Sequence, residues 1–261
     1  MSNLIKRILT GIIGIPVLLL IFYTGGIYFL IFSLIVTCGA LWEFFKMSEK
    51  RNFHPLKIPG MILSAVFLFY SYNTEDEPLI LLPVVFILLS AAEIFRRDNK
   101  NPLNPFIAVS GIIYITVPFA LLGKINGYSE INLLIYIFVM IWICDTAAYF
   151  GGKYFGRHKL SSISPNKTLE GSAAGFLFTL LSSAAVHYIY PDKLSLTDAL
   201  SSGIITGVFS QSGDLFESLL KRYAGVKDSS EIIPGHGGIL DRFDSVIFVA
   251  PVLYVYFKYI S

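Results

Sequence analysis

Residues 218–244 read SLLKRYAGVKDSSEIIPGHGGILDRFD, and apolar segments flank them at 199–220 and 243–260. The stretch holds four cations, four acids and a histidine with glycines around it. The charged residues are Lys221, Arg222, Lys227, Arg242, Asp228, Glu231, Asp241 and Asp244. The whole chain is 54% hydrophobic and only 15% charged, so this cluster is a local exception. It predicts a site for a polyanionic ligand at a membrane surface.

The apolar composition indicates a membrane protein, because a soluble domain of this length carries charge on about a quarter of its residues. A membrane-spanning helix needs roughly 20 mostly apolar residues. Nine segments qualify or come close, separated by polar and turn-forming residues. Their limits are 8–23, 27–45, 58–72, 79–95, 105–122, 131–150, 171–190, 199–220 and 243–260. The expected fold is all-α: a polytopic integral membrane protein with about nine transmembrane helices.

The Lys and Arg residues predict the orientation, because cytoplasmic loops of membrane proteins carry an excess of them. With the N-terminus in the cytoplasm, 17 of the 20 fall on the cytoplasmic side, and only Lys124, Lys193 and Lys258 fall on the other. The polar loops 151–170 and 221–242 then both face the cytoplasm. We expect one membrane-embedded domain over 1–261 in the cell (inner) membrane. Within it, residues 1–104 serve as scaffold and 105–261 carry the active site.

The segment before the motif also carries charge at membrane depth. Asp214, Glu217, Ser218 and Lys221 have the spacing of one helical face. A carboxylate inside the membrane costs about 3 kcal/mol on insertion scales and usually faces a polar cavity. Asp214 is therefore a candidate catalytic and metal-binding residue. An ion pair of Lys221 with Asp214 or Glu217 that only locks helices together is the alternative.

The glycine-rich part of the motif, residues 234–244, precedes an expected helix. Gly237 and Gly238 allow the backbone to turn amide groups toward an anion, and a helix N-terminus also favours phosphate. Asp241 fits a metal ligand that shares Mg²⁺ with Asp214, while substrate phosphate completes the shell. Helix capping is the alternative for Asp241, and compensation of the helix dipole is the alternative for Asp244. His236 is either a phosphate donor or proton acceptor, or a plain loop histidine.

A second polar loop follows an acid in the sixth apolar segment. Asp145 is isolated in that segment, and Lys153, Arg157 and Lys167 follow among glycines and aromatic residues. The three cations suit phosphate groups, although no Walker A pattern is present and positive-inside charges are the alternative reading. Glu43 and Glu93 lie near predicted cytoplasmic helix ends and are interpreted as interfacial or helix-pairing residues.

These residues resemble a known family. Ser218-x-x-Lys-Arg, Lys227-Asp-Ser and Pro-Gly-His-Gly-Gly-x-Leu-Asp-Arg-x-Asp244 are similar to the signature of the phosphatidate cytidylyltransferases, the CDP-diacylglycerol synthases. Ser-Pro-Asn-Lys-Thr-Leu-Glu-Gly at 164–171 resembles the same family. The rest of the chain matches only as a polytopic membrane scaffold.

The resemblance implies that CTP and phosphatidate react to give CDP-diacylglycerol and pyrophosphate. It implies Mg²⁺ at acids matching Asp214 and Asp241, a possible monovalent cation such as K⁺, and a homodimer. We expect no nucleic-acid partner. We predict two groups of site residues. The catalytic group is Lys221, Asp241, Asp214, Arg222 and His236. The substrate-binding group is Asp145, Lys153, Lys167, Lys227, Gly237, Gly238 and Arg242.

Two other functions compete with this interpretation. A transporter of an anionic solute predicts repeated halves and interrupted helices, which the sequence does not show. A CTP-dependent polyprenol kinase uses the same nucleotide but adds only one phosphate to its lipid. The residues alone indicate a metal-assisted membrane enzyme that acts on phosphates, and the resemblance favours the cytidylyltransferase.

Overall fold

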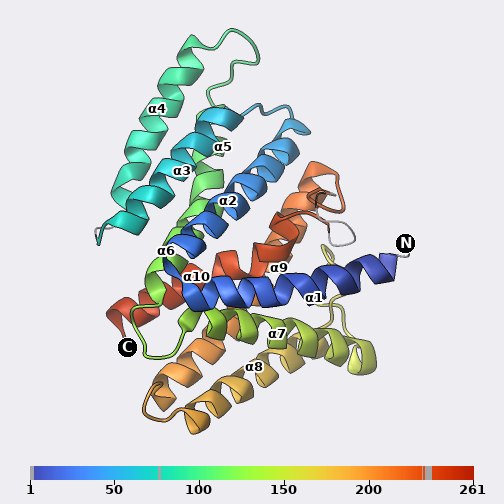
Figure 1. Cartoon of the computed structure of the whole chain (residues 1–261). Helices are drawn as coiled ribbons and strands as arrows, with labels where there is room; N and C mark the ends of the chain where they lie inside the picture. Colours follow the sequence, from blue (N-terminus) through green and yellow to red (C-terminus); the bar gives the residue numbers. More distant parts are fainter. Residues whose placement is uncertain (1–2, 76–77, 231, 233–236) are drawn as a thin grey trace. The chain divides into compact units, whose positions relative to one another are not determined.

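The computed structural model describes residues 3–75, 78–230, 232 and 237–261, with side chains from residue 11 onward (Figure 1). These residues form helices joined by loops, of which the two longest lie between α7 and α8 and between α9 and α10. Within these ranges the β-structure is limited to one isolated antiparallel bridge, between Lys159 and Thr168. The expected all-α fold is confirmed.

Each of the nine apolar segments coincides with a helical segment of the described chain. These are α1 (Asn3–Thr24), α2 (Gly26–Glu49), α3 (Lys57–Asn73), η1 (Pro78–Leu81) with α4 (Leu82–Phe95), α5 (Asn104–Gly111) with η2 (Ile112–Thr116) and α6 (Val117–Ile125), α7 (Leu133–Phe155), α8 (Leu169–Ile189), α9 (Leu196–Ala224) and α10 (Leu240–Tyr259). Five are long and apolar enough to cross a membrane: Gly26–Glu49, Pro78–Phe95, Asn104–Ile125, Leu133–Phe155 and Leu169–Ile189. The fold is therefore that of a polytopic membrane protein.

Local sequence signals set several helix ends. The Asn132 side chain accepts a hydrogen bond from the Ile135 amide at the start of α7, and Thr168 accepts one from Gly171 at the start of α8. Both residue types are preferred caps, because they satisfy amides that have no partner inside the helix. Helix α9 ends just before Gly225, whose φ of +74° suits the left-handed residue after a helix.

The chain divides into two compact units, and the divisions fall within α6, α9 and α10. The first unit combines Met1–Gly123 with Leu220–Arg242, and the second combines Lys124–Leu219 with Phe243–Ser261. In the first unit α2 packs on α3 and on the α5–η2 segment, and α4 packs on α5. Its core includes the fully enclosed aromatic side chains of Phe22, Phe45, Phe67 and Phe119.

In the second unit α7 and α8 pack closely along their lengths (Figure 1). Glycines make this approach possible, because a Cβ added to Gly171 would lie 2.6 Å from the Ala148 carbonyl oxygen. A Cβ on Gly175 would lie 2.9 Å from the Cys144 carbonyl oxygen. Small residues at helix contacts are typical of membrane proteins, where close backbone approach drives association.

The outward faces of several helices are apolar. Ile62 on α3, Ile87 on α4 and Phe178 on α8 are more than half exposed, as are many other large hydrophobic side chains. Such extensive exposed apolar surface is unfavourable in water but is the expected exterior of a protein in lipid. The exposed side chains therefore support the membrane location that the composition predicts.

We expect His158 and Lys193 to lie on opposite sides of the membrane. The reason is the asymmetric distribution of Lys and Arg, which places the 151–170 loop in the cytoplasm and Lys193 outside. His158→Cys and Lys193→Cys, each in a Cys38→Ala, Cys144→Ala background, should react with a membrane-impermeant thiol reagent from opposite sides. Permeabilised membranes serve as the control in which both react. Labelling of both from one side of intact membranes would contradict the orientation.

Candidate functional site

The motif residues of the first unit surround a buried ion pair. Asp241 lies in the first turn of α10, and its Oδ1 accepts a hydrogen bond from Lys221 Nζ at 2.5 Å. The two side chains are only 7% and 12% exposed, so water screens the pair weakly. Buried ions need partners to offset their lost hydration, and charge-assisted hydrogen bonds are the strongest partners available. The pair therefore fixes the end of α9 to the start of α10 within this unit.

The second oxygen of Asp241 holds the loop that precedes it. Oδ2 accepts hydrogen bonds from the Ser229 amide at 3.0 Å, the Ser229 hydroxyl at 2.8 Å and the Gly238 amide at 2.9 Å. The bond to Gly238, three residues before Asp241, is the backward contact found in capping boxes. Asp241 lies inside the first turn of α10, so it is not the N-cap that was the alternative, and it holds the preceding loop instead. Its predicted role as a metal ligand stays a prediction.

Glu43, from α2, holds the same loop from the other side. Its carboxylate is fully buried and accepts four hydrogen bonds. Oε1 takes the Ser230 hydroxyl at 2.5 Å and the Ile239 amide at 2.9 Å. Oε2 takes the Ser229 hydroxyl at 2.9 Å and the Leu240 amide at 2.8 Å. The sequence interpretation was an interfacial or helix-pairing residue, and these contacts make Glu43 an anchor that joins α2 to the motif loop and the start of α10.

Gly237 and Gly238, the described glycines of residues 234–244, are required by the local geometry of this loop. Gly237 has a φ of +83°, which residues with a Cβ rarely adopt. A Cβ on Gly238 would overlap the Ser229 hydroxyl and lie 2.6 Å from Glu43 Oε2. The amides of Gly238, Ile239 and Leu240 donate to Asp241 and Glu43, so the anions they contact here belong to the chain itself. Substrate binding by Gly237 and Gly238 stays a prediction.

Three exposed cations accompany this buried core. Arg222, Lys227 and Arg242 are all exposed, in contrast to Lys221. Arg222 Nη1 donates to the Val226 carbonyl at 3.1 Å, which closes the chain after α9. Residues 218–244 therefore combine one largely buried, fixed cation, Lys221, with three cations accessible to a ligand. His236, which we predicted to be catalytic, lies outside the described residues.

The second unit holds the other group of predicted residues. Lys167 forms an ion pair with Asp214, and Ser218 Oγ lies 3.5 Å from Asp214 Oδ1. The buried Asp244 interacts electrostatically with Asp214, Asp145 and Lys167. Asp244 is therefore not a solvent-facing charge at a helix start. It joins three predicted site residues in a group of three acids and one lysine, which sequence spacing alone did not bring together.

The loop before α8 positions Lys167. The Glu170 carboxylate accepts hydrogen bonds from the Arg157 amide at 3.0 Å and from His158 Nδ1 at 2.6 Å. The Leu160 amide donates to the Lys167 carbonyl at 2.8 Å. Lys153 lies between the rings of Tyr149 and Tyr154, 6.0 and 5.7 Å from their centroids. Lys153 is thus held by contacts with aromatic faces, whereas Lys167 is held by a folded loop.

The carboxylates of Asp145, Asp214 and Asp244 are the kind of oxygen ligand that a hard divalent cation prefers, although they do not supply a complete coordination shell. Among the described residues, no three His, Cys, Asp or Glu side chains form a group that could hold a metal ion by themselves. Mg²⁺ commonly binds through one or two carboxylates and takes its other ligands from water and substrate phosphates. Mutual repulsion among Asp145, Asp214 and Asp244 would also be relieved by a bound cation. The residues present are therefore compatible with Mg²⁺ bound together with a phosphorylated substrate.

Together, the helices and charged groups define a polytopic membrane protein with side chains suited to phosphorylated ligands. The chain belongs to the cytidylyltransferase family, whose family model matches residues 5–260. The phosphatidate cytidylyltransferase of Staphylococcus aureus (strain COL) is 34% identical over 255 residues, 95% of this chain and 96% of that protein. Those of Staphylococcus saprophyticus and Staphylococcus haemolyticus are 34% and 32% identical over the same shares. The resemblance stated from the motifs is confirmed.

We expect Glu43→Gln to loosen the motif loop and lower thermal stability. Whichever way the new amide is oriented, its NH₂ group faces the amide of Ile239 or Leu240, and one buried donor loses its acceptor. Such a loss costs about 1–3 kcal/mol. Thermal unfolding and limited digestion with trypsin at Lys227 measure the two effects.

Glu93→Gln is the matched control. Glu93 is another buried acid of the first unit, and it accepts hydrogen bonds from the Asn101 amide in a different loop and from the Asn104 side chain at the start of α5. It should lower stability without exposing Lys227 to trypsin. Equal cleavage at Lys227 in wild type and Glu43→Gln would show that Glu43 does not hold the motif loop.

Proposed function

We propose that the chain transfers the cytidylyl group of CTP to phosphatidate, forming CDP-diacylglycerol and pyrophosphate for phospholipid synthesis. The observation that carries this proposal is the buried Lys221–Asp241 pair with accessible Arg and Lys around it. The motif that supplies these residues resembles the family signature, and the chain matches relatives named for this activity over 95% of its length. A membrane location also suits an enzyme whose lipid substrate lies in the bilayer.

The reaction needs charge neutralisation more than a strong base. An oxygen of the phosphatidate phosphate attacks the α-phosphorus of CTP, and the bond to the bridging oxygen breaks as pyrophosphate leaves. A phosphate monoester is already ionised near neutral pH, so it does not depend on a residue to remove its proton. Both reactants are anions, and catalysis then comes from positioning and from cations that offset their repulsion.

The cations of the two units suit these tasks. In the first unit, Lys221 is held rigidly by Asp241 and suits a fixed contact to a phosphate oxygen, while Arg222, Lys227 and Arg242 are accessible partners for phosphate groups. In the second unit, Lys167 and Lys153 suit the triphosphate, and the Tyr149 and Tyr154 rings beside Lys153 suit stacking with a base. Asp145 is assigned to nucleotide binding and His236 to a phosphate contact, as the sequence predicts.

Mg²⁺ and a monovalent cation such as K⁺ are the proposed cofactors. Asp214 and Asp241 are the predicted Mg²⁺ ligands, and the interaction of Asp244 with Asp214 makes it a further candidate. When bound, Mg²⁺ neutralises phosphate charge and orients the phosphoryl group. Lys167 pairs with Asp214, so a ligand phosphate that attracts Lys167 would free that carboxylate for the cation.

The proposed setting is the inner membrane, with the active site on the cytoplasmic side. CTP is dissolved in the cytosol and phosphatidate lies in the leaflet, so a site at the cytoplasmic surface meets both. The excess of Lys and Arg in the 151–170 and 221–242 loops supports this orientation. A homodimer remains part of the proposal because the resemblance implies it.

The product identifies the reaction. Purified protein with phosphatidate, CTP labelled in the base and Mg²⁺ should form a labelled lipid, and EDTA should abolish its formation. Labelled CDP-diacylglycerol is the expected product. A lipid that gains one phosphate without the base would indicate a kinase, whereas uptake of an anion into liposomes with no lipid product would indicate a transporter.

We expect Lys167→Met to raise the KM for CTP by roughly 10- to 100-fold, since a charge-assisted hydrogen bond contributes about 1.5–3 kcal/mol. The Lys167–Asp214 pair is 27% and 36% exposed, so its loss should change thermal stability little. Lys159→Met, in the same loop, is the control for a general loss of positive charge. An unchanged KM for CTP in Lys167→Met would remove Lys167 from the nucleotide site.

A further inference from the structure

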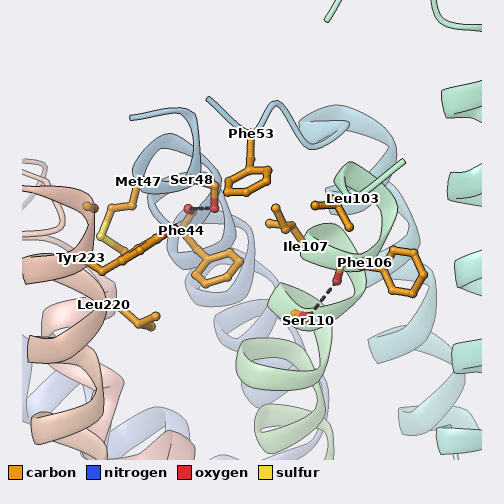
Figure 2. A pocket seen from close by; sticks show the side chains of 11 residues that line it. Phe44, Met47, Ser48, Phe53, Leu103, Phe106, Ile107, Ser110, Leu220 and Tyr223 are labelled. Atoms are coloured by element: carbon orange, nitrogen blue, oxygen red, sulfur yellow. Dashed lines mark hydrogen bonds between the residues drawn. The ribbon is translucent and has the colours of Figure 1, made fainter. Parts of the chain in front are cut away.

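An apolar groove lies beside the motif in the first unit, between α2, α5 and the last turns of α9. Its volume is about 320 Å³. Figure 2 shows side chains of the three helices around this space. The main apolar contributors are Phe44, Met47, Phe106, Ile107, Leu220 and Tyr223. The volume falls at the lower end of the ~300–1,000 Å³ typical of ligand pockets, which are mostly apolar with few polar groups.

The groove is open on one side to the exterior of the first unit. Leu103, Phe106 and Tyr223 line it and are 49%, 56% and 59% exposed. In a membrane protein, an apolar opening on the helix surface can admit hydrocarbon chains. From Leu103 to Ser110 the α5 wall extends about 10 Å, at 1.5 Å per residue. This length suits part of an acyl chain.

A cation is fixed at the wall of the groove. Arg51 donates a hydrogen bond from Nε to the Tyr223 carbonyl, and its guanidinium carbon lies 4.9 Å from the centre of the Tyr223 ring. Arg51 is exposed, and a guanidinium has four further N–H donors suited to phosphate. The groove therefore combines an apolar wall with an anion-binding group, which matches a lipid that has a phosphate headgroup.

The same turns of α9 also form part of the motif. Leu220 and Tyr223 line the groove, whereas Lys221, between them in sequence, bonds to Asp241 on another face of the helix. The groove and the Lys221–Asp241 pair thus share the same turns of α9 on different faces. A chain in the groove would leave its headgroup close to the motif cations.

We propose that this groove holds an acyl chain of the phosphatidate substrate, with Arg51 beside the lipid phosphate. This inference rests on the proposed function and adds the lipid subsite to it. The groove makes the enzyme sensitive to how far the acyl chain extends, because a chain that reaches Ser110 buries more methylenes than one that stops earlier. Ordinary bilayer lipid and a helix of a second copy are the competing occupants, and the tests below separate them.

Ser110→Trp tests the groove by filling it. Ser110 is exposed, and its hydroxyl donates within its own helix to the Phe106 carbonyl, so its replacement should not disturb the fold. We expect the KM for dioleoyl phosphatidate to rise roughly tenfold, because excluding two methylenes from an apolar site costs about that much affinity. The KM for dihexanoyl phosphatidate, whose chains reach less far, and the KM for CTP should not change.

Ile113→Trp is the matched control, since Ile113 is 48% exposed on the same helical segment but does not line the groove. Equal effects on long and short lipids, no effect on either, or the same effect in Ile113→Trp would overturn the proposal. A change of oligomeric state in Ser110→Trp alone would assign the groove to a second copy instead.

A binding experiment is independent of turnover. Phosphatidate with a diazirine at mid-chain, added to the full-length protein in phosphatidylcholine nanodiscs, should label peptides containing Phe44 or Phe106. Unlabelled phosphatidate should compete, phosphatidylcholine should not, and Ser110→Trp should lose the label. Equal competition by phosphatidylcholine would indicate ordinary bilayer lipid and overturn the proposal. Specific labelling without CDP-diacylglycerol formation would leave the groove in place and overturn the proposed function.

Discussion

The buried carboxylate of Glu43 is the constraint on which the motif depends. A charge in an apolar helix must be paired or hydrogen-bonded, because its desolvation otherwise costs several kcal/mol. Here its two oxygens accept hydrogen bonds from Ser229, Ser230, Ile239 and Leu240. One side chain of α2 therefore holds Ser229, Ser230 and Ile239 of the loop and the start of α10. Asp241 is thereby brought to Lys221.

This arrangement separates charges that are satisfied inside the protein from charges that are exposed to a ligand. Glu43, Asp241 and Lys221 satisfy one another or the loop amides within a buried cluster, whereas Arg222, Lys227 and Arg242 remain exposed. A pre-formed set of cations loses little conformational freedom when an anionic ligand binds, so more of the contact energy serves transition-state stabilisation. A reaction between two anions requires fixed positive charge, and this set of cations supplies it.

The fold was predictable from sequence because apolar length alone identifies membrane helices, and each apolar segment corresponds to a helix. Helix ends were less accurate: the limit of 220 for α9 became 224, where Gly225 takes a positive φ. The motif residues were also identified, but their partners were not. The Glu43 contacts span about 190 residues, and such pairings depend on tertiary packing that no local pattern encodes. An isolated acid in an apolar segment was the available signal for Glu43, as it was for Asp145 and Asp214.

Turnover in a Glu43 variant tests the link between this buried interaction and the reaction most directly. The rate of CDP-diacylglycerol formation should be measured at saturating CTP and phosphatidate, below the unfolding temperature, for Glu43→Gln and for Glu93→Gln. The account predicts a large fall in kcat for Glu43→Gln and a nearly unchanged kcat for Glu93→Gln. Full kcat in Glu43→Gln would contradict it and show that the motif reaches its active geometry without the carboxylate of α2.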